Sequence, residues 1–207
     1  MKIQTAGFFS LLAVLGAMTA ISSCSKTDYV AGLWQGNPEH IVSIPSASDA
    51  TSTITIDFAP RSDKKGQGQV DLNAVIEVQQ AVVGSIVDMQ SPYQTNITAT
   101  ASISGYYAPE KGEDDDFILS FDASSLKVNV DPSGVVFVND AVSNMERPVL
   151  DSLTTATADQ WRVILTKVMR EEFYKFSRIE DVEVHHNDMM SMEIDNHDKV
   201  FRRIAQN

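Results

Sequence analysis

Cysteine is almost absent from this chain, because Cys24 is the only one in 207 residues. A single thiol has no internal partner, so a disulfide framework is excluded. Long hydrophobic runs are also scarce. The apolar stretch 8–18 is shorter than the roughly 20 residues that a helical membrane span needs. We therefore expect no membrane-spanning helix.

Basic side chains are few, with 16 Lys and Arg against 28 Asp and Glu, and the net charge is −12. A surface this acidic repels nucleic acid and anionic head groups. The charge balance therefore excludes nucleic acid as a partner, but it does not say what the partner is.

Catalytic motifs are missing as well. The sequence has no GxSxG or HExxH pattern and no Asp-x-Asp-x-Asp-Gly calcium loop. The acidic run 113–116 is typical of a solvated loop. We predict neither an enzyme nor a cofactor.

A metal site is the most specific chemical hypothesis that the side chains allow. His185 and His186 lie near Asp188, and His197 follows Asp195 across an expected hairpin. Imidazole and carboxylate groups are zinc ligands. However, adjacent residues of a strand point to opposite faces, so the first two histidines cannot bind one ion without a bulge. We favour solvent-facing polar residues and predict no metal.

The N-terminal segment carries the clearest motif. Lys2 precedes the apolar stretch 8–18, and Ile21-Ser22-Ser23-Cys24 follows it. This segment resembles a bacterial lipobox, which implies a signal peptide over 1–23, an acylated Cys24, a tether over 24–30 and one domain over 31–207. Acyl chains on Cys24 would make the lipid bilayer a partner. The alternative is cleavage by an ordinary signal peptidase, which leaves Cys24 as an incidental free thiol.

The rest of the chain is rich in β patterns. In 52–58 and 96–107, apolar or small residues alternate with polar ones, as in strands with one buried face. Turn signals separate the segments, which indicates a barrel or a sandwich of antiparallel strands. The expected extended segments are 41–44, 52–58, 70–78, 96–107, 117–121, 126–130, 135–138, 179–186, 190–194 and 199–204.

One segment has helical spacing instead. Thr157 and Gln160 fit a capping box, and Trp161, Leu165 and Val168 recur on one face. The pattern predicts a single helix over about 158–176, before the final strands. Its apolar stripe is expected to face the β core.

The start of the domain resembles the lipocalin-like barrels. Gly32 and Trp34 form the Gly-x-Trp pair of that family, whose tryptophan packs across the barrel floor. The resemblance implies that a late arginine, Arg202 or Arg203, stacks over the indole. It also implies an antiparallel barrel of about eight strands, and the open alternative is a β-sandwich plus helix. A helix before three β segments departs from the usual lipocalin and is more similar to lipocalin-like lipoproteins of the Bacteroidetes type.

That resemblance also bears on location. In those bacteria an acidic tripeptide after the lipidated cysteine favours the cell surface, and Ser25-Lys26-Thr27-Asp28 contains one acid. We therefore expect an outer-membrane anchor on the periplasmic face.

Two functions are open at this point. The lipocalin-like layout implies a barrel pocket for a small hydrophobic ligand. The alternative is a structural or assembly lipoprotein that docks another envelope protein. It predicts a filled interior and a contiguous exposed apolar or aromatic patch, with Tyr93, Tyr106 and Tyr107 as candidates.

Overall fold

A computed structural model describes residues 29–204, apart from 43, 45–46, 65, 84–92, 114, 139–141 and 143. Cys24, the expected signal peptide and most of the expected tether therefore lie outside the described residues.

The strands follow the alternation of the sequence, with inward apolar and outward polar side chains. The early expected segment 41–44 is the exception, because Val42 lies in a turn and a two-residue strand precedes it. The strands are β1 (Gly32–Gly36), β2 (Glu39–His40), β3 (Asp49–Pro60), β4 (Gly68–Val83), β5 (Tyr93–Pro109), β6 (Phe117–Phe121), β7 (Lys127–Asn129), β8 (Val135–Phe137), β9 (Arg178–His185), β10 (Met189–Ile194) and β11 (His197–Arg203).

Eight of these strands close into an antiparallel barrel. The order around it is β1–β11–β10–β9–β6–β5–β4–β3, and β3 pairs back with β1. The described part of the chain is thus mainly β, with one α-helix before the final strands, as the sequence predicted. The sandwich alternative is not the fold that forms.

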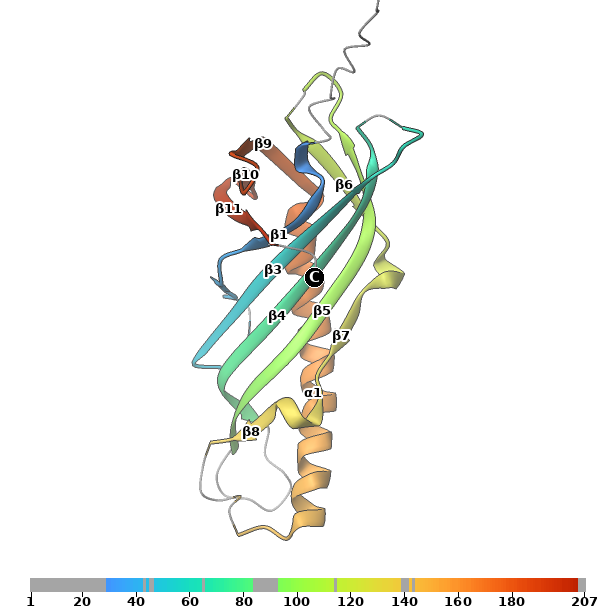
Figure 1. Cartoon of the computed structure of the whole chain (residues 1–207). Coiled ribbons are helices and arrows are strands. Elements are labelled where there is room, and N and C mark those ends of the chain that lie inside the picture. The colour runs from blue at the N-terminus through green and yellow to red at the C-terminus, as the bar shows by residue number, and fades with distance from the viewer. Residues whose placement is uncertain are drawn as a thin grey trace, which may run out of the picture.

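The long strands β3, β4 and β5 extend beyond the closed barrel (Figure 1). Along the free side of β5, the short strands β8, β7 and β6 pair one after another. The helix α1 (Arg147–Tyr174) passes behind this part of the sheet and contacts β5, β7 and β8. The barrel therefore lies at one end of the molecule, and the other end is a sheet covered by the helix.

The helix begins 11 residues earlier than predicted, at Arg147 rather than 158. Thr157 does not cap it. This residue is buried in mid-helix, and its Oγ1 donates a 2.8 Å hydrogen bond to the Leu153 carbonyl one turn back. Threonine forms such bonds inside helices as well as at N-caps, so the residue type alone misled the prediction. The predicted end is close, because a 3₁₀ turn over Lys175–Ser177 follows Tyr174.

One hydrophobic core joins the barrel and the helix. Trp161, Leu165 and Phe173 of α1 are buried in the same cluster as the inward side chains of β3, β4 and β5. Burial of large apolar side chains contributes about 1.5–3 kcal/mol each, so this shared core is the main force that holds the helix on the sheet.

Candidate functional site

The end of the barrel nearest Tyr29 is closed by a tryptophan and an arginine. Trp34 of β1 is fully buried, and its indole Nε1 donates a 2.7 Å hydrogen bond to the Val30 carbonyl. The guanidinium carbon of Arg203 lies 4.2 Å from the centroid of the Trp34 ring. These two residues are opposite each other in the β1–β11 pairing, so the register of the final strand makes the contact.

Arg203 also ties two chain segments together. It donates hydrogen bonds to the Ala31 carbonyl at 2.8 Å and to the Asn187 carbonyl at 2.7 Å. Arg202, the neighbouring residue, points to the opposite face of the strand. Of the two late arginines, Arg203 is therefore the one over the indole.

Gly32 is required by this arrangement. Its φ is +114°, in the region that favours glycine, and a Cβ there would lie 2.7 Å from Nη1 of Arg203. The Gly-x-Trp pair thus has a local physical meaning. The glycine makes room for the arginine that covers the tryptophan.

The inside of the barrel is occupied by large side chains. Phe58, Tyr107 and Phe117 are buried and form edge-to-face contacts, with centroid distances of 5.2 and 6.0 Å. Met190, Met192 and other strand residues fill the same cluster. The well-formed hollows along the described residues lie on the outside of this core.

The predicted aromatic patch is wrong for two of its three tyrosines. Tyr93 and Tyr107 are each 1% exposed, whereas Tyr106 is 56% exposed. Tyr107 continues the inward phase of Ile97 and Ile103 on β5, so strict alternation contains this information.

Tyr106 borders a groove of about 310 Å³ on the outer rim of the barrel. Ala108 and Ile118 add apolar surface to the groove, and Arg61 and Lys64 of the β3–β4 connection add positive charge. Register produces this grouping, because Ala108 of β5 is opposite Ile118 of β6. The sequence places these residues in three separate segments.

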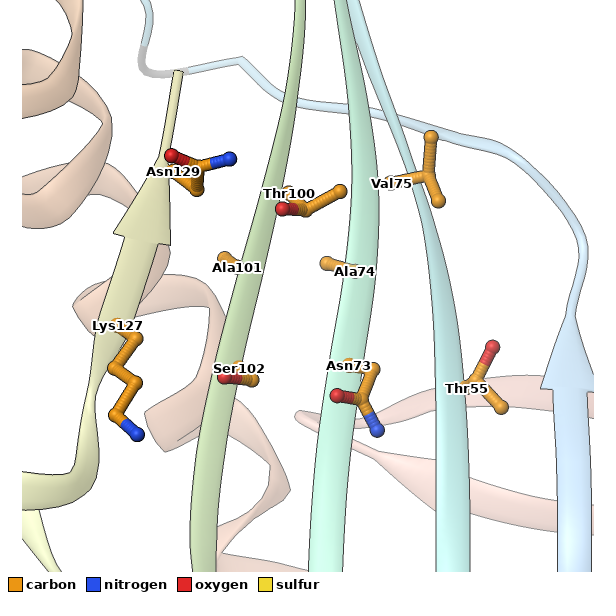
Figure 2. A pocket seen from close by; sticks show the side chains of 9 residues that line it. All are labelled: Thr55, Asn73, Ala74, Val75, Thr100, Ala101, Ser102, Lys127 and Asn129. Atoms are coloured by element: carbon orange, nitrogen blue, oxygen red, sulfur yellow. The ribbon is translucent and has the colours of Figure 1, made fainter. Parts of the chain in front are cut away.

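A second hollow, of about 380 Å³, lies on the outer face of β3, β4, β5 and β7 (Figure 2). Thr55, Asn73, Thr100 and Asn129 present uncharged polar groups there, and Lys127 is its one cation. Such a surface can form hydrogen bonds, but it holds no acid–base pair for catalysis.

Two carboxylates are opposite each other on the same outer face. Asp57 of β3 pairs with Asp71 of β4 in the register. Partial burial, and secondly the charge of Asp71, raise the pKa of Asp57 above its ordinary value. The pair disfavours its own ionisation and is a local weakness of the sheet.

The acidic run 113–116 was expected to be solvated, and Asp116 at its end corrects this, because it is buried, whereas Glu113 is exposed as expected. β6 and β9 pair at only two positions, Phe117–Ile179 and Ile118–Arg178. The Asp116 carboxylate accepts a hydrogen bond from the Asp181 backbone N–H at 3.1 Å. The loop thereby closes the barrel where strand pairing is shortest.

Arg178 binds three carboxylates at the barrel seam, the place where β6 pairs with β9. It contacts Glu110 at 2.8 Å, Glu180 at 2.7 Å and Asp116 at 3.6 Å. The hydrogen bond that Arg178 donates to Glu110, together with the charges of all three acids, raises the pKa of Arg178. The sequence predicted an extended segment over 179–186, but it did not show that Arg178 at its start binds a loop about 65 residues earlier in the chain.

The histidines do not form a catalytic or metal-binding constellation within the described residues. His185 has Nε2 at 3.3 Å from the Ser191 Oγ and at 3.5 Å from Glu183. A hydrolase triad needs the serine and the acid on different ring nitrogens, so this trio lacks that geometry. His186 lies in a turn after β9, and Nδ1 of His197 is 2.6 Å from the Asp195 carbonyl. No group of three or more His, Cys, Asp or Glu suited to a metal ion occurs in the described part of the chain.

Comparison with family models, with curated proteins and with solved structures gives no match. None of the described helices is both long enough and apolar enough to cross a bilayer.

Proposed function

We propose that the chain is an envelope lipoprotein, anchored to the outer membrane on its periplasmic face through acylated Cys24, whose barrel docks another envelope protein. The observation that supports docking is the packed barrel interior, together with the groove at Tyr106 and Ile118 on the outside. Exposed apolar surface rimmed by polar residues is typical of protein–protein contact.

The charges around the groove indicate the chemistry of its partner. Lys64 has no ion pair among the described residues, and Arg61 is held by Asp63 at 2.7 Å. A partner that inserts an apolar side chain beside Tyr106 and presents an acid to Lys64 would match the groove.

The experiment is native mass spectrometry of the protein extracted from its own envelope. We expect a second protein chain to remain bound to the wild type and to be lost from Tyr106→Ser. Val75→Ser is a matched control, because Val75 is also exposed on the outer sheet but lies outside the groove. A partner that survives in Tyr106→Ser, or is lost equally in both variants, contradicts docking at this groove.

A small hydrophobic ligand inside the barrel is the second candidate. Two features favour it: an eight-stranded barrel is a size that can hold one small ligand, and the interior contains Met190 and Met192. Methionine side chains adapt to irregular shapes, so a ligand could displace them. The same spectra distinguish the two functions, because this candidate requires a bound mass of a few hundred daltons that disappears on unfolding.

A further inference from the structure

The outer face of α1 has acidic and basic side chains at opposite ends, so it is complementary in charge to a second copy of itself in the reverse direction. Asp159 lies in the N-terminal half of the helix, whereas Lys167 and Arg170 lie in its C-terminal half, and all three are exposed. Val163 lies midway between Asp159 and Lys167 and is 73% exposed, the highest value among the large apolar residues of the helix. The helix therefore has an exposed apolar centre with opposite charges on either side.

We infer that α1 pairs with α1 of a second copy, antiparallel, about a two-fold axis at Val163. In an antiparallel pair, each residue faces the one equally far on the other side of the axis. Asp159 therefore faces Lys167 of the second copy, four residues from the axis in each direction.

Size complementarity supports the same register. Seven residues from the axis, Ala156 faces Arg170, and eleven residues from it, Ser152 faces Tyr174. Each large side chain thus meets a small one. At 100° per residue, these positions all project within about 40° of the direction of Val163, so they form one stripe.

The cations of the stripe are available for such a contact. Within the described residues, Lys167 and Arg170 form no ion pair, although acids outnumber bases in the chain. A parallel pair would instead place Lys167 against Lys167 and Asp159 against Asp159. Charge therefore selects the antiparallel arrangement.

The interface is expected to be weak in solution. A helix of 28 residues is about 42 Å long, so a stripe about 10 Å wide buries roughly 800 Å² in total. This is below the standard size of a stable complex. The two-fold axis is perpendicular to both helices. If this axis is also perpendicular to the bilayer, the two copies are at the same height above it, and both can be anchored in one bilayer. Pairing itself does not depend on the proposed anchor, which would only raise the local concentration.

The test is disulfide formation in envelopes that contain the full chain. Val163→Cys places a thiol on the axis, where an antiparallel pair brings the two copies together. Ser152→Cys is the matched control, because its two copies would lie about 33 Å apart along the antiparallel helices. We expect at least fivefold more crosslinked dimer for Val163→Cys. Equal crosslinking of both variants indicates parallel helices, and no crosslinking in either overturns the pairing.

Charge reversal provides an independent readout. In the Val163→Cys background, Lys167→Asp should lower crosslinking about fivefold, and adding Asp159→Lys should restore it. Arg202→Asp, which reverses an exposed cation on the final strand β11, should have no effect. Failure of the double exchange to restore crosslinking contradicts the register. Separation of the same samples into membrane and soluble fractions tests the anchor independently. The crosslinked dimer is measured in the fraction that contains the protein, so a failed anchor does not hide the pairing.

Discussion

Replacing Gly32 by alanine is expected to destabilise the barrel end by about 2–5 kcal/mol. At φ +114°, a residue with a Cβ costs about 1–3 kcal/mol of backbone strain. The new methyl group would also lie 2.7 Å from Nη1 of Arg203, so the guanidinium must move away. The ring contact with Trp34 and the bond to Ala31 contribute about 1–2 kcal/mol together, after a discount for the exposure of Arg203.

Two comparisons separate these contributions. Gly112 has a φ of +100° with open space where its Cβ would lie, so Gly112→Ala should show the backbone cost alone, about 1–3 kcal/mol. In an Arg203→Ala background the guanidinium is absent, so Gly32→Ala should again destabilise the protein only by the backbone cost. The coupling between the two positions is then about 1–2 kcal/mol.

The assay is equilibrium unfolding in urea, followed by tryptophan fluorescence. Trp34 and Trp161 are both buried, so the emission reports loss of the native core. If Gly32→Ala costs the same with and without Arg203, the close approach of the guanidinium is not what requires glycine. If it costs no more than Gly112→Ala, the same conclusion follows independently.

Three further predictions concern the sheet, the seam and the helix. Asp71→Asn should stabilise the protein by about 0.5 kcal/mol at pH 7. The pKa of Asp57 is raised in the folded state, so ionisation of Asp57 opposes folding. Below the ordinary pKa of 3.8, Asp57 is protonated in both states, and the stabilisation by Asp71→Asn should vanish. Urea titrations at several pH values measure this change. Arg178→Gln leaves three carboxylates facing one another without their cation, so hydrogen exchange at the amides of Phe117 and its neighbours should accelerate. The acceleration should be smaller at acid pH, where the carboxylates are protonated. Unchanged exchange would exclude a role of Arg178 in closing the barrel between β6 and β9. Trp161→Ala should cost about 3–5 kcal/mol in the same unfolding assay, and a cost below 1 kcal/mol would show that the helix is not part of the core.

The sequence predicted the barrel because alternation records which face of a strand is buried. Ile54 and Ile56 on β3 and Ile97 and Ile103 on β5 show the period of two clearly. Closure itself was not visible in the pattern, since it depends on β1 pairing with both β3 and β11, far apart in sequence.

The helix shows where local signals fail. Thr154 and Thr155 have weak helix propensity, and the turn before Thr157 has few apolar residues, so the pattern favoured a later start. Burial of Leu153 against the sheet outweighs this propensity. Tertiary packing, rather than the local sequence, therefore sets where α1 begins.

The candidate sites depended even more on register. Ala108 and Ile118 meet through β5–β6 pairing, and Arg178 meets Glu110 across the barrel seam. Neither contact has a signature in sequence spacing. The Trp34–Arg203 contact, by contrast, was expected from a resemblance of only a few residues.

The most direct test of the proposed anchor is the intact mass of the mature protein isolated from its own envelope. We predict an N-terminus at Cys24 that carries acyl chains, and release of the Cys24→Ser variant from the membrane fraction. A mature chain that begins elsewhere, or one with an unmodified Cys24 thiol, would contradict the anchored lipoprotein.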